Sequence, residues 1–328
     1  MTYALIAFTD KGKALADTIA EALGGECMRC NRPMNLDEWT KTNFKKNKGL
    51  IIVGAVGIAV RAIAPYIRGK ADDPAVVVVD ELGNYSIPIL SGHLGGANCL
   101  AGKISDIIGA IPVITTATDL NDVFAVDEWA KRHGCVIENT DRIKSISGRL
   151  LAGQTVLVKS AWNITGNLPN GVLISSDDEC DITVDIRCGK SDALHVIPKI
   201  AVLGVGCKKG TQKEIIEESL EALLEKTNLS INAVCSAATI DLKANEQGLL
   251  DFCKAHGWNL TCCSAEELNG VRGDFTSSGF VKSVTGTENV CERAAVLISG
   301  GRLFCKKTAQ NGVTMAIALK SFSPDWSY

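Results

Sequence analysis

The clearest chemical signal in the sequence is a histidine set among glycines, within the stretch from Ser86 to Asn98. The stretch reads Ser-Ile-Pro-Ile-Leu-Ser-Gly-His-Leu-Gly-Gly-Ala-Asn, and its imidazole belongs to His93. Histidine changes charge near neutral pH and therefore suits proton transfer. A glycine-rich turn lets backbone N–H groups approach an anion closely. These residue types at this spacing predict a general base beside an anion site.

Carboxylates follow a strand that we expect to pair with the one leading to His93. Asp80 and Glu81 end that strand, so either carboxylate is expected within reach of the imidazole. A plain hairpin turn explains both residues equally well. The sequence leaves these two interpretations open.

Two further groups of polar residues are candidates for ligand contacts. Arg61, Arg68 and Lys70 follow a glycine turn at 54–57, where they form either an ordinary solvated face or a rim that receives carboxylates. A polar run ends another predicted strand, and helix capping accounts for one of its members at most. The members of this run are Thr115, Thr116, Thr118 and Asp119.

A second glycine-rich junction opens the C-terminal part. It reads Gly204-Val205-Gly206-Cys207-Lys208-Lys209-Gly210. Compared with the dinucleotide fingerprint, it has one residue too many before the last glycine, and it lacks the Gly-Lys-Ser/Thr of a phosphate loop. A tight turn is the plain explanation. The two adjacent lysines nevertheless favour anion binding.

The other three histidines have structural explanations. His133 and His256 each precede a glycine at a predicted helix end, where a cation stabilises the helix dipole. His195 lies in the segment 191–198, which we interpret as a linker.

Alternating strands and helices must position these residues. Short apolar runs at 4–8, 50–53, 76–80 and 85–90 predict strands, and apolar positions from Ala97 to Ile108 recur at helical spacing. The sequence therefore predicts an α/β fold with an N-terminal three-layer part, a small middle part and a separate C-terminal domain with a mixed sheet. We place the three parts at 1–134, 135–197 and 198–328. Capping boxes are predicted at Thr211 with Glu214 and at Ser264 with Glu267.

The composition limits the class of protein. The 328 residues are 46% hydrophobic and 22% charged, with a formal net charge of −3, which gives no reason to expect nucleic acid or a membrane as partner. The N-terminal apolar run is too short for a signal peptide, so we expect a cytoplasmic protein with reduced cysteines. Cys27 and Cys30 form one Cys-x-x-Cys pair without a second pair, which argues against a zinc site and leaves a redox role open. We expect no metal site.

Longer motifs resemble the cobalt-precorrin-5A hydrolase family of the anaerobic branch of cobalamin biosynthesis. In the N-terminal part they are Gly57-Ile58-Ala59-Val60-Arg61, Asp73-Pro74-Ala75-Val76-Val77-Val78, Ser91-Gly92-His93-Leu94-Gly95-Gly96-Ala97-Asn98 and Pro112-Val113-Ile114-Thr115-Thr116-Ala117-Thr118-Asp119. In the C-terminal part they are Leu203-Gly204-Val205-Gly206-Cys207-Lys208-Lys209-Gly210-Thr211, Asp241-Leu242-Lys243 and Gly312-Val313-Thr314. The resemblance spans nearly the whole chain. In the middle segment, from about 135 to 197, it rests only on the position of that segment between the two parts that carry the motifs.

The resemblance implies a cobalt-bearing, carboxylate-rich tetrapyrrole as substrate. The implied reaction opens the ring A lactone and then releases acetaldehyde to give cobalt-precorrin-5B. It needs no added cofactor, since cobalt arrives with the substrate. Other enzymes of the pathway and a second copy of the chain are the further partners that we consider.

Site roles follow from the residues and the resemblance together. We expect His93 to be the base, oriented by Glu81 or Asp80, with the N–H groups of Gly95 and Gly96 stabilising an oxyanion. The remaining expected substrate contacts are Arg61, Lys70, Ser91, Gly92, Asn98, Thr115, Thr116, Asp119, Gly204, Gly206, Cys207, Lys208 and Lys209. Axial ligation of the substrate's cobalt is a rival role for His93.

Two other functions stay open at this point. A non-catalytic carrier of tetrapyrrole intermediates would need the same basic residues and glycine turns, and acetaldehyde release distinguishes it from the enzyme. A nucleotide-binding protein is disfavoured by the defective fingerprints.

Overall fold

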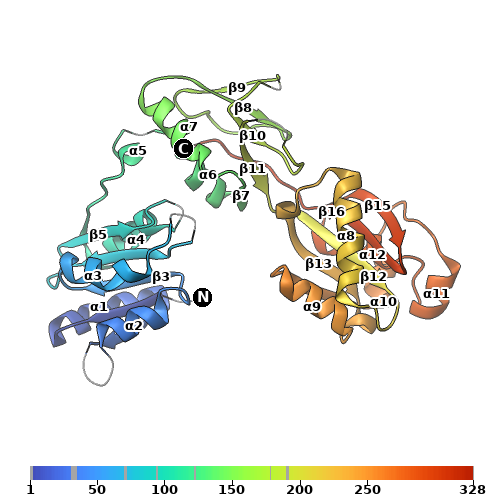
Figure 1. Cartoon of the computed structure of the whole chain (residues 1–328), viewed down its shortest axis with the longest axis horizontal. Coiled ribbons are helices and arrows are strands. Elements are labelled where there is room, and N and C mark those ends of the chain that lie inside the picture. Colours follow the sequence, from blue (N-terminus) through green and yellow to red (C-terminus); the bar gives the residue numbers. More distant parts are fainter. Residues whose placement is uncertain are drawn as a thin grey trace. The chain divides into compact units, whose positions relative to one another are not determined.

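The computed structural model describes residues 3–30, 35–69, 72–93, 95–121, 123–177, 179–189 and 192–327, with backbone alone at 118 and 119. The chain divides into two compact units, Met1–Lys131 with Ile143–Gln154, and Arg132–Arg142 with Thr155–Tyr328. Within these described ranges, three sheets of six, five and five strands occupy the N-terminal, middle and C-terminal parts, and Figure 1 shows their strands. The predicted α/β fold class is confirmed.

The N-terminal sheet has the strand order β2-β1-β3-β4-β5-β6. The strands β1 to β4 are parallel, and β5 runs antiparallel to β4. The strands β3 and β4 are buried along their whole length, as apolar runs covered on both faces require. The strand bounds are β1 (Tyr3–Ala7), β2 (Glu26–Arg29), β3 (Gly49–Val53), β4 (Ala75–Val79), β5 (Tyr85–Leu90) and β6 (Ile111–Pro112).

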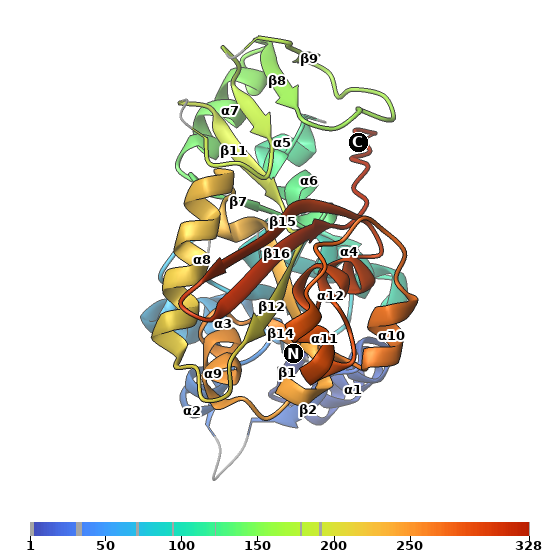
Figure 2. The ribbon, with the colours of Figure 1, turned by 90° about the vertical axis from the view of Figure 1, so that its right-hand side faces the viewer.

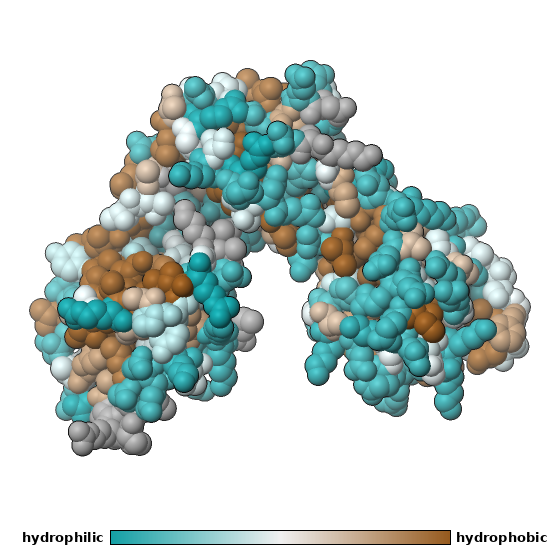
Figure 3. All heavy atoms as spheres, in the orientation of Figure 1, coloured by the Kyte–Doolittle hydropathy of each residue, from teal (hydrophilic) through white to brown (hydrophobic). Residues whose placement is uncertain are grey.

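Helices cover both faces of this sheet. Apolar side chains of α1 (Asp10–Leu23) and α4 (Ala97–Ile108) pack on one face. Those of α2 (Leu36–Asn43) and α3 (Val56–Ile63) pack on the other. Pro65 lies in the 3-10 turn η1 (Ala64–Tyr66), which directly follows α3, and a proline at this point prevents the helix from continuing. Figure 3 shows hydrophobic side chains gathered around α3 and β5, where Val56, Val60 and Ile67 are exposed.

The middle sheet corrects one sequence expectation. The segment 191–198 is not a linker, because it contains β11 (Leu194–Pro198), which is buried throughout. This strand pairs with β10 (Ile182–Val184) and β7 (Cys135–Ile137) in the order β7-β11-β10-β8-β9. The other strands are β8 (Val156–Ser160) and β9 (Val172–Ile174), and the helices nearby in sequence are α5 (Ala117–Leu120), α6 (Val126–Arg132) and α7 (Arg142–Leu151).

The C-terminal sheet has the order β14-β13-β12-β16-β15, with parallel and antiparallel neighbours, so the predicted mixed sheet is confirmed. Its strands are β12 (Ala201–Cys207), β13 (Val234–Ile240), β14 (Asn259–Cys263), β15 (Arg302–Gln310) and β16 (Val313–Leu319). Figure 2 shows α8 (Lys213–Thr227) and α9 (Gln247–Ala255) on one side of this sheet. On the other side lie α10 (Ala265–Gly270), α11 (Gly279–Thr285) and α12 (Cys291–Ser299). Two short 3-10 turns, η2 (Ile231–Ala233) and η3 (Asp241–Lys243), flank β13.

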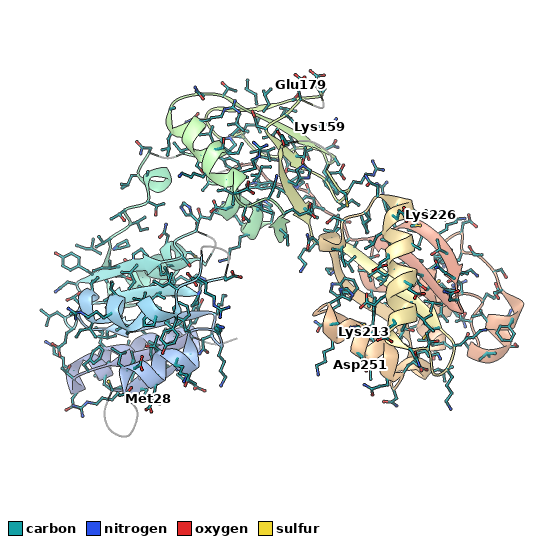
Figure 4. The ribbon with its side chains drawn as sticks, viewed as in Figure 1. Met28, Lys159, Glu179, Lys213, Lys226 and Asp251 are labelled. Atoms are coloured by element: carbon teal, nitrogen blue, oxygen red, sulfur yellow. The ribbon has the colours of Figure 1, made fainter. Side chains whose placement is uncertain are left out.

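Charged side chains project from the outer faces of α8 and α9. Figure 4 shows Lys213 and Lys226 projecting outward from the two ends of α8, and Asp251 projecting from α9. The opposite face of α8 buries Leu220 and Leu223 in the core. Across the described parts of the chain, no helix combines the length and the apolar character that crossing a bilayer requires.

One predicted capping box is present and the other is wrong. Ser264 accepts the backbone N–H of Glu267, and the Glu267 carboxylate accepts the backbone N–H of Ser264, as predicted. The helix α8 instead begins at Lys213, and Gln212 at its N-cap makes no side-chain hydrogen bond. The Thr211 hydroxyl donates to the carbonyl oxygen of Lys208 and so closes the preceding turn rather than capping the helix.

Candidate active site

The direction of β5 decides where His93 lies. Because β5 is antiparallel to β4, it begins at the hairpin turn and carries the chain to the edge of the sheet at which β3 and β4 begin. The register pairs Val79 with Ser86 and Val76 with Leu90. His93 follows at this edge, which is opposite to the carboxyl ends of the parallel strands.

The structure therefore does not bring Asp80 or Glu81 to the imidazole. Both belong to the hairpin turn, and at about 3.3 Å per strand residue Asp80 is on the order of 13 Å from the residue opposite Leu90. The Asp80 carboxylate accepts the backbone N–H groups of Leu82 and Tyr85, and Glu81 accepts the Thr9 hydroxyl. The plain hairpin-turn interpretation describes their contacts.

A different carboxylate faces His93. The His93 Nδ1 atom lies 3.7 Å from an Asp127 carboxylate oxygen, and the two side chains are only 13% and 10% exposed. Asp127 is in the first turn of α6, surrounded in sequence by the buried residues Ala125, Val126 and Trp129. Low exposure weakens solvent screening of this contact, so a charge on the carboxylate acts on the imidazole more strongly than it would at an exposed surface.

His93 and Asp127 line a cavity of about 380 Å³. Its walls combine apolar groups with polar ones, as small-molecule sites generally do. The full lining is Ile67, Gly69, Asp73, Ile89, Leu90, Ser91, Gly92, His93, Thr116 and Asp127. The Asp73 carboxylate accepts the backbone N–H groups of Arg68 and Gly69, which fixes the loop on one side of the cavity.

The glycine-rich turn is tightly closed. Ser91 adopts a left-handed backbone with a φ of 56°, and its carbonyl accepts the N–H of Ala97. A Cβ atom on Gly95 would lie 2.3 Å from the Cβ of Ser91, so only glycine fits there. Gly96 has a φ of 87° and caps α4. The buried Ser91 hydroxyl, which lines the cavity, has no hydrogen-bond partner within the described residues.

The polar run after β6 contributes to the same site. The Asn98 amide donates to the Thr116 hydroxyl at 3.0 Å, and Asn98 in turn occupies the space beside Gly92. Thr115 precedes Thr116 in the segment between β6 and α5. Asp119 lies in α5, where the structure describes only its backbone.

The structure describes the position of only one of Arg61 and Lys70, the two basic residues of the N-terminal part that we expect to contact the substrate. Arg61 is exposed in the last turn of α3, where its guanidinium lies beside Gly57, and it does not line the His93 cavity. Lys70 lies outside the described residues.

The second glycine junction belongs to the other compact unit. Gly204 allows close packing of α12, because a Cβ there would lie 1.8 Å from the Cys291 carbonyl oxygen. Gly206 similarly faces the Thr314 hydroxyl. Cys207 ends β12, and burial raises the pKa of its thiol. Lys208 and Lys209 follow on the exposed turn before α8.

Fold and site together define an α/β protein with a histidine–carboxylate pair in a small cavity lined by apolar and polar groups, and such a pair has the residue types that general acid–base catalysis requires. Three family models match the chain in succession. "Cobalamin synthesis G N-terminal" covers residues 38–119, "Cobalamin biosynthesis central region" covers 124–197 and "Cobalamin synthesis G C-terminus" covers 201–318.

Curated relatives agree with the family models. The "Cobalt-precorrin-5A hydrolase" of Priestia megaterium is 33% identical over 84% of this chain and 79% of its own length. The protein of the same name from Salmonella typhimurium is 30% identical over 96% of this chain and 97% of its own length. The chain belongs to the cobalt-precorrin-5A hydrolase family.

Proposed function

We propose that this protein is a hydrolase of cobalamin biosynthesis that acts on cobalt-precorrin-5A. Its reaction opens the ring A lactone and releases acetaldehyde to give cobalt-precorrin-5B. Family membership carries the proposal, since the named relatives match most of the chain. The cavity around His93 supports the chemistry, because both steps need a positioned base.

In the first step water adds to the lactone carbonyl. His93 takes a proton from the attacking water, and Asp127 stabilises the imidazolium that forms. Backbone donors of the glycine turn stabilise the oxyanion on the carbonyl oxygen. The sequence assigns this role to the N–H groups of Gly95 and Gly96, and Gly95 lines a cavity other than the one that holds His93. Collapse of this intermediate breaks the ester C–O bond, and the alkoxide that leaves receives the proton from His93.

In the second step the liberated hydroxyl loses its proton to the base. Its oxygen forms a C=O bond to the carbon that also carries the methyl group, and the bond between that carbon and the macrocycle breaks. Acetaldehyde departs, while the electron pair enters the conjugated ring and its cobalt and is later protonated. Electrons and atoms balance without an added cofactor, because cobalt is part of the substrate.

The remaining contacts are proposals from the sequence. We assign the substrate's outer carboxylates to Arg61, Lys70, Lys208 and Lys209, and we retain the division into parts at 1–134, 135–197 and 198–328. The three family models follow one another in the same order, and the central one begins at residue 124, inside the first of these parts.

Anaerobic incubation of the purified protein with cobalt-precorrin-5A tests the proposal. We expect one equivalent of acetaldehyde per substrate consumed, trapped as its hydrazone and measured chromatographically. Binding of the substrate without acetaldehyde would contradict the enzymatic assignment and favour the carrier.

A further inference from the structure

A second cavity adjoins the one that holds His93. Its volume is about 490 Å³, and it shares Asp73 with the first cavity. Both cavities also take neighbouring residues from the same two loops, Gly69 and Arg68 from one and His93 and Gly95 from the other. The full lining is Phe44, Lys45, Asn47, Lys48, Tyr66, Arg68, Asp72, Asp73, Pro74 and Gly95.

The charge of this second cavity is predominantly positive at its rim. Lys45, Lys48 and Arg68 are exposed side chains along its lining. Of the two acidic residues, Asp73 is buried and already accepts backbone N–H groups, and Asp72 is exposed. The lining therefore has three cationic side chains and two carboxylates, of which the Asp73 carboxylate is already hydrogen-bonded and the Asp72 carboxylate is exposed to solvent.

A further lysine lies close to the second cavity. Burial lowers the pKa of Lys131, and the charges of Lys48 and Lys103 lower it further, whereas Glu128 acts in the opposite direction. The Lys131 ammonium lies beside Gly96, one residue after the Gly95 that lines the cavity. Lysines close enough to repel one another favour an anion between or beside them.

The remaining walls suit the apolar part of a ligand. The rings of Phe44 and Tyr66 lie 5.9 Å apart at a tilt of 37°, and both line the cavity. Lys48 lies over the Tyr3 ring, with its ammonium 5.7 Å from the ring centroid, a contact that leaves its N–H donors available.

We propose that this second cavity is a carboxylate subsite, in which Lys45, Lys48 and Arg68 bind acetate or propionate side chains of the tetrapyrrole whose reacting edge occupies the His93 cavity. This inference rests on the proposed function for the identity of the ligand. Arginine and lysine are the side chains that recognise carboxylates most strongly, and Asp73 lines both cavities, which places them close enough for different groups of one large ligand.

A binding experiment with a matched control tests the subsite. The cavity variant is Lys48→Gln with Arg68→Gln, and the control is Lys41→Gln with Lys46→Gln, which removes the same charge from exposed positions outside the lining. The probe is uroporphyrin III, which carries acetate and propionate side chains and lacks the lactone. We expect the cavity variant to raise its Kd by about tenfold, with a weaker salt dependence, and the control to change it less than twofold. Equal changes in both variants would overturn the subsite.

The same variants in the acetaldehyde assay separate the two proposals. With the subsite as described, the cavity variant raises KM while kcat stays near that of the unsubstituted protein. If the unsubstituted protein releases no acetaldehyde and the cavity variant alone loses uroporphyrin III affinity, the reaction is refuted and the subsite stands. If acetaldehyde is released with an unchanged KM and Kd in the cavity variant, the subsite is refuted and the reaction stands.

Discussion

Replacing Asp127 by asparagine removes the charge that faces His93 and keeps the shape of the side chain. The two groups lie 3.7 Å apart and are about one-tenth exposed. Near this separation, a pair of unit charges in a partly screened site interacts by about 4 kcal/mol. The asparagine dipole and residual solvent recover roughly half of this, so the imidazolium formed during proton abstraction loses about 2 kcal/mol. That loss corresponds to a fall in kcat of about 30-fold.

Steady-state acetaldehyde release measures this effect directly. We expect Asp127→Asn to lower kcat by about 30-fold and to leave KM within about twofold, because Asp127 acts through His93 rather than by binding substrate. Asp106→Asn, at an exposed position on α4, is the matched control and is expected to retain full activity. A kcat within twofold of the unsubstituted protein, or a loss confined to KM, would refute the positioning role of Asp127.

Three further predictions concern the folded chain. Gly204→Ala is expected to lower the free energy of unfolding by about 2 to 3 kcal/mol in urea titrations, because its Cβ would lie 1.8 Å from the Cys291 carbonyl oxygen. Gly102→Ala, with open space on α4, should instead be neutral or stabilising by about 0.5 kcal/mol, and equal losses would contradict the packing argument. Burial raises the pKa of Cys291 to about 12, so iodoacetamide at about pH 8 is expected to label exposed Cys99 and spare Cys291 in mass spectra of the folded protein, whereas comparable labelling would contradict the burial. Hydrogen bonds from the backbone N–H and the hydroxyl of its N-cap residue hold the pKa of Glu267 below 4.5, so its contribution to stability is present above that value and is lost as the pH falls through the lower folded pKa. Glu267→Gln should therefore flatten the dependence of the unfolding midpoint on pH between about 5 and 3, and an unchanged slope would argue against the capping contact.

The strand, glycine turn and helix around His93 are predicted well from sequence because they are local. Apolar runs determine β5 and α4, and the glycines between them determine the turn. The mixed C-terminal sheet likewise follows from consecutive units with clear apolar periodicity and turn residues. Such features depend on residues close together in the chain.

The carboxylate that faces His93 is predicted wrongly because that contact depends on strand direction and on a distant segment. Because β4 and β5 are antiparallel, β4 ends at the edge of the sheet opposite to the one where β5 ends. Asp80 and Glu81, which follow β4, are therefore far from His93, which follows β5. Asp127 is 34 positions beyond His93 and directly follows the apolar residues Phe124, Ala125 and Val126, which suggests that it is buried and needs a partner. Because any hydrogen-bond donor or cation could be that partner, the sequence does not identify His93.

The strand β11 is missed for a related reason. Polar residues precede Leu194 and a proline ends the segment, a pattern typical of linkers. In the structure, β11 lies between β10 and β7, and this pairing buries its apolar residues. The tertiary pairing therefore overrides the linker-like composition of the segment.

The central claim is that the imidazole of His93 takes a proton during the reaction. The most direct measurement is the rate of acetaldehyde formation by His93→Gln at saturating cobalt-precorrin-5A, recorded together with the visible spectrum of the bound substrate. We predict a fall in kcat of at least about 100-fold with an unchanged spectrum, because the glutamine amide does not act as a base. A kcat within a few-fold of the unsubstituted protein would contradict the claim. A shifted cobalt absorption band would contradict it as well, since it would assign His93 to axial ligation.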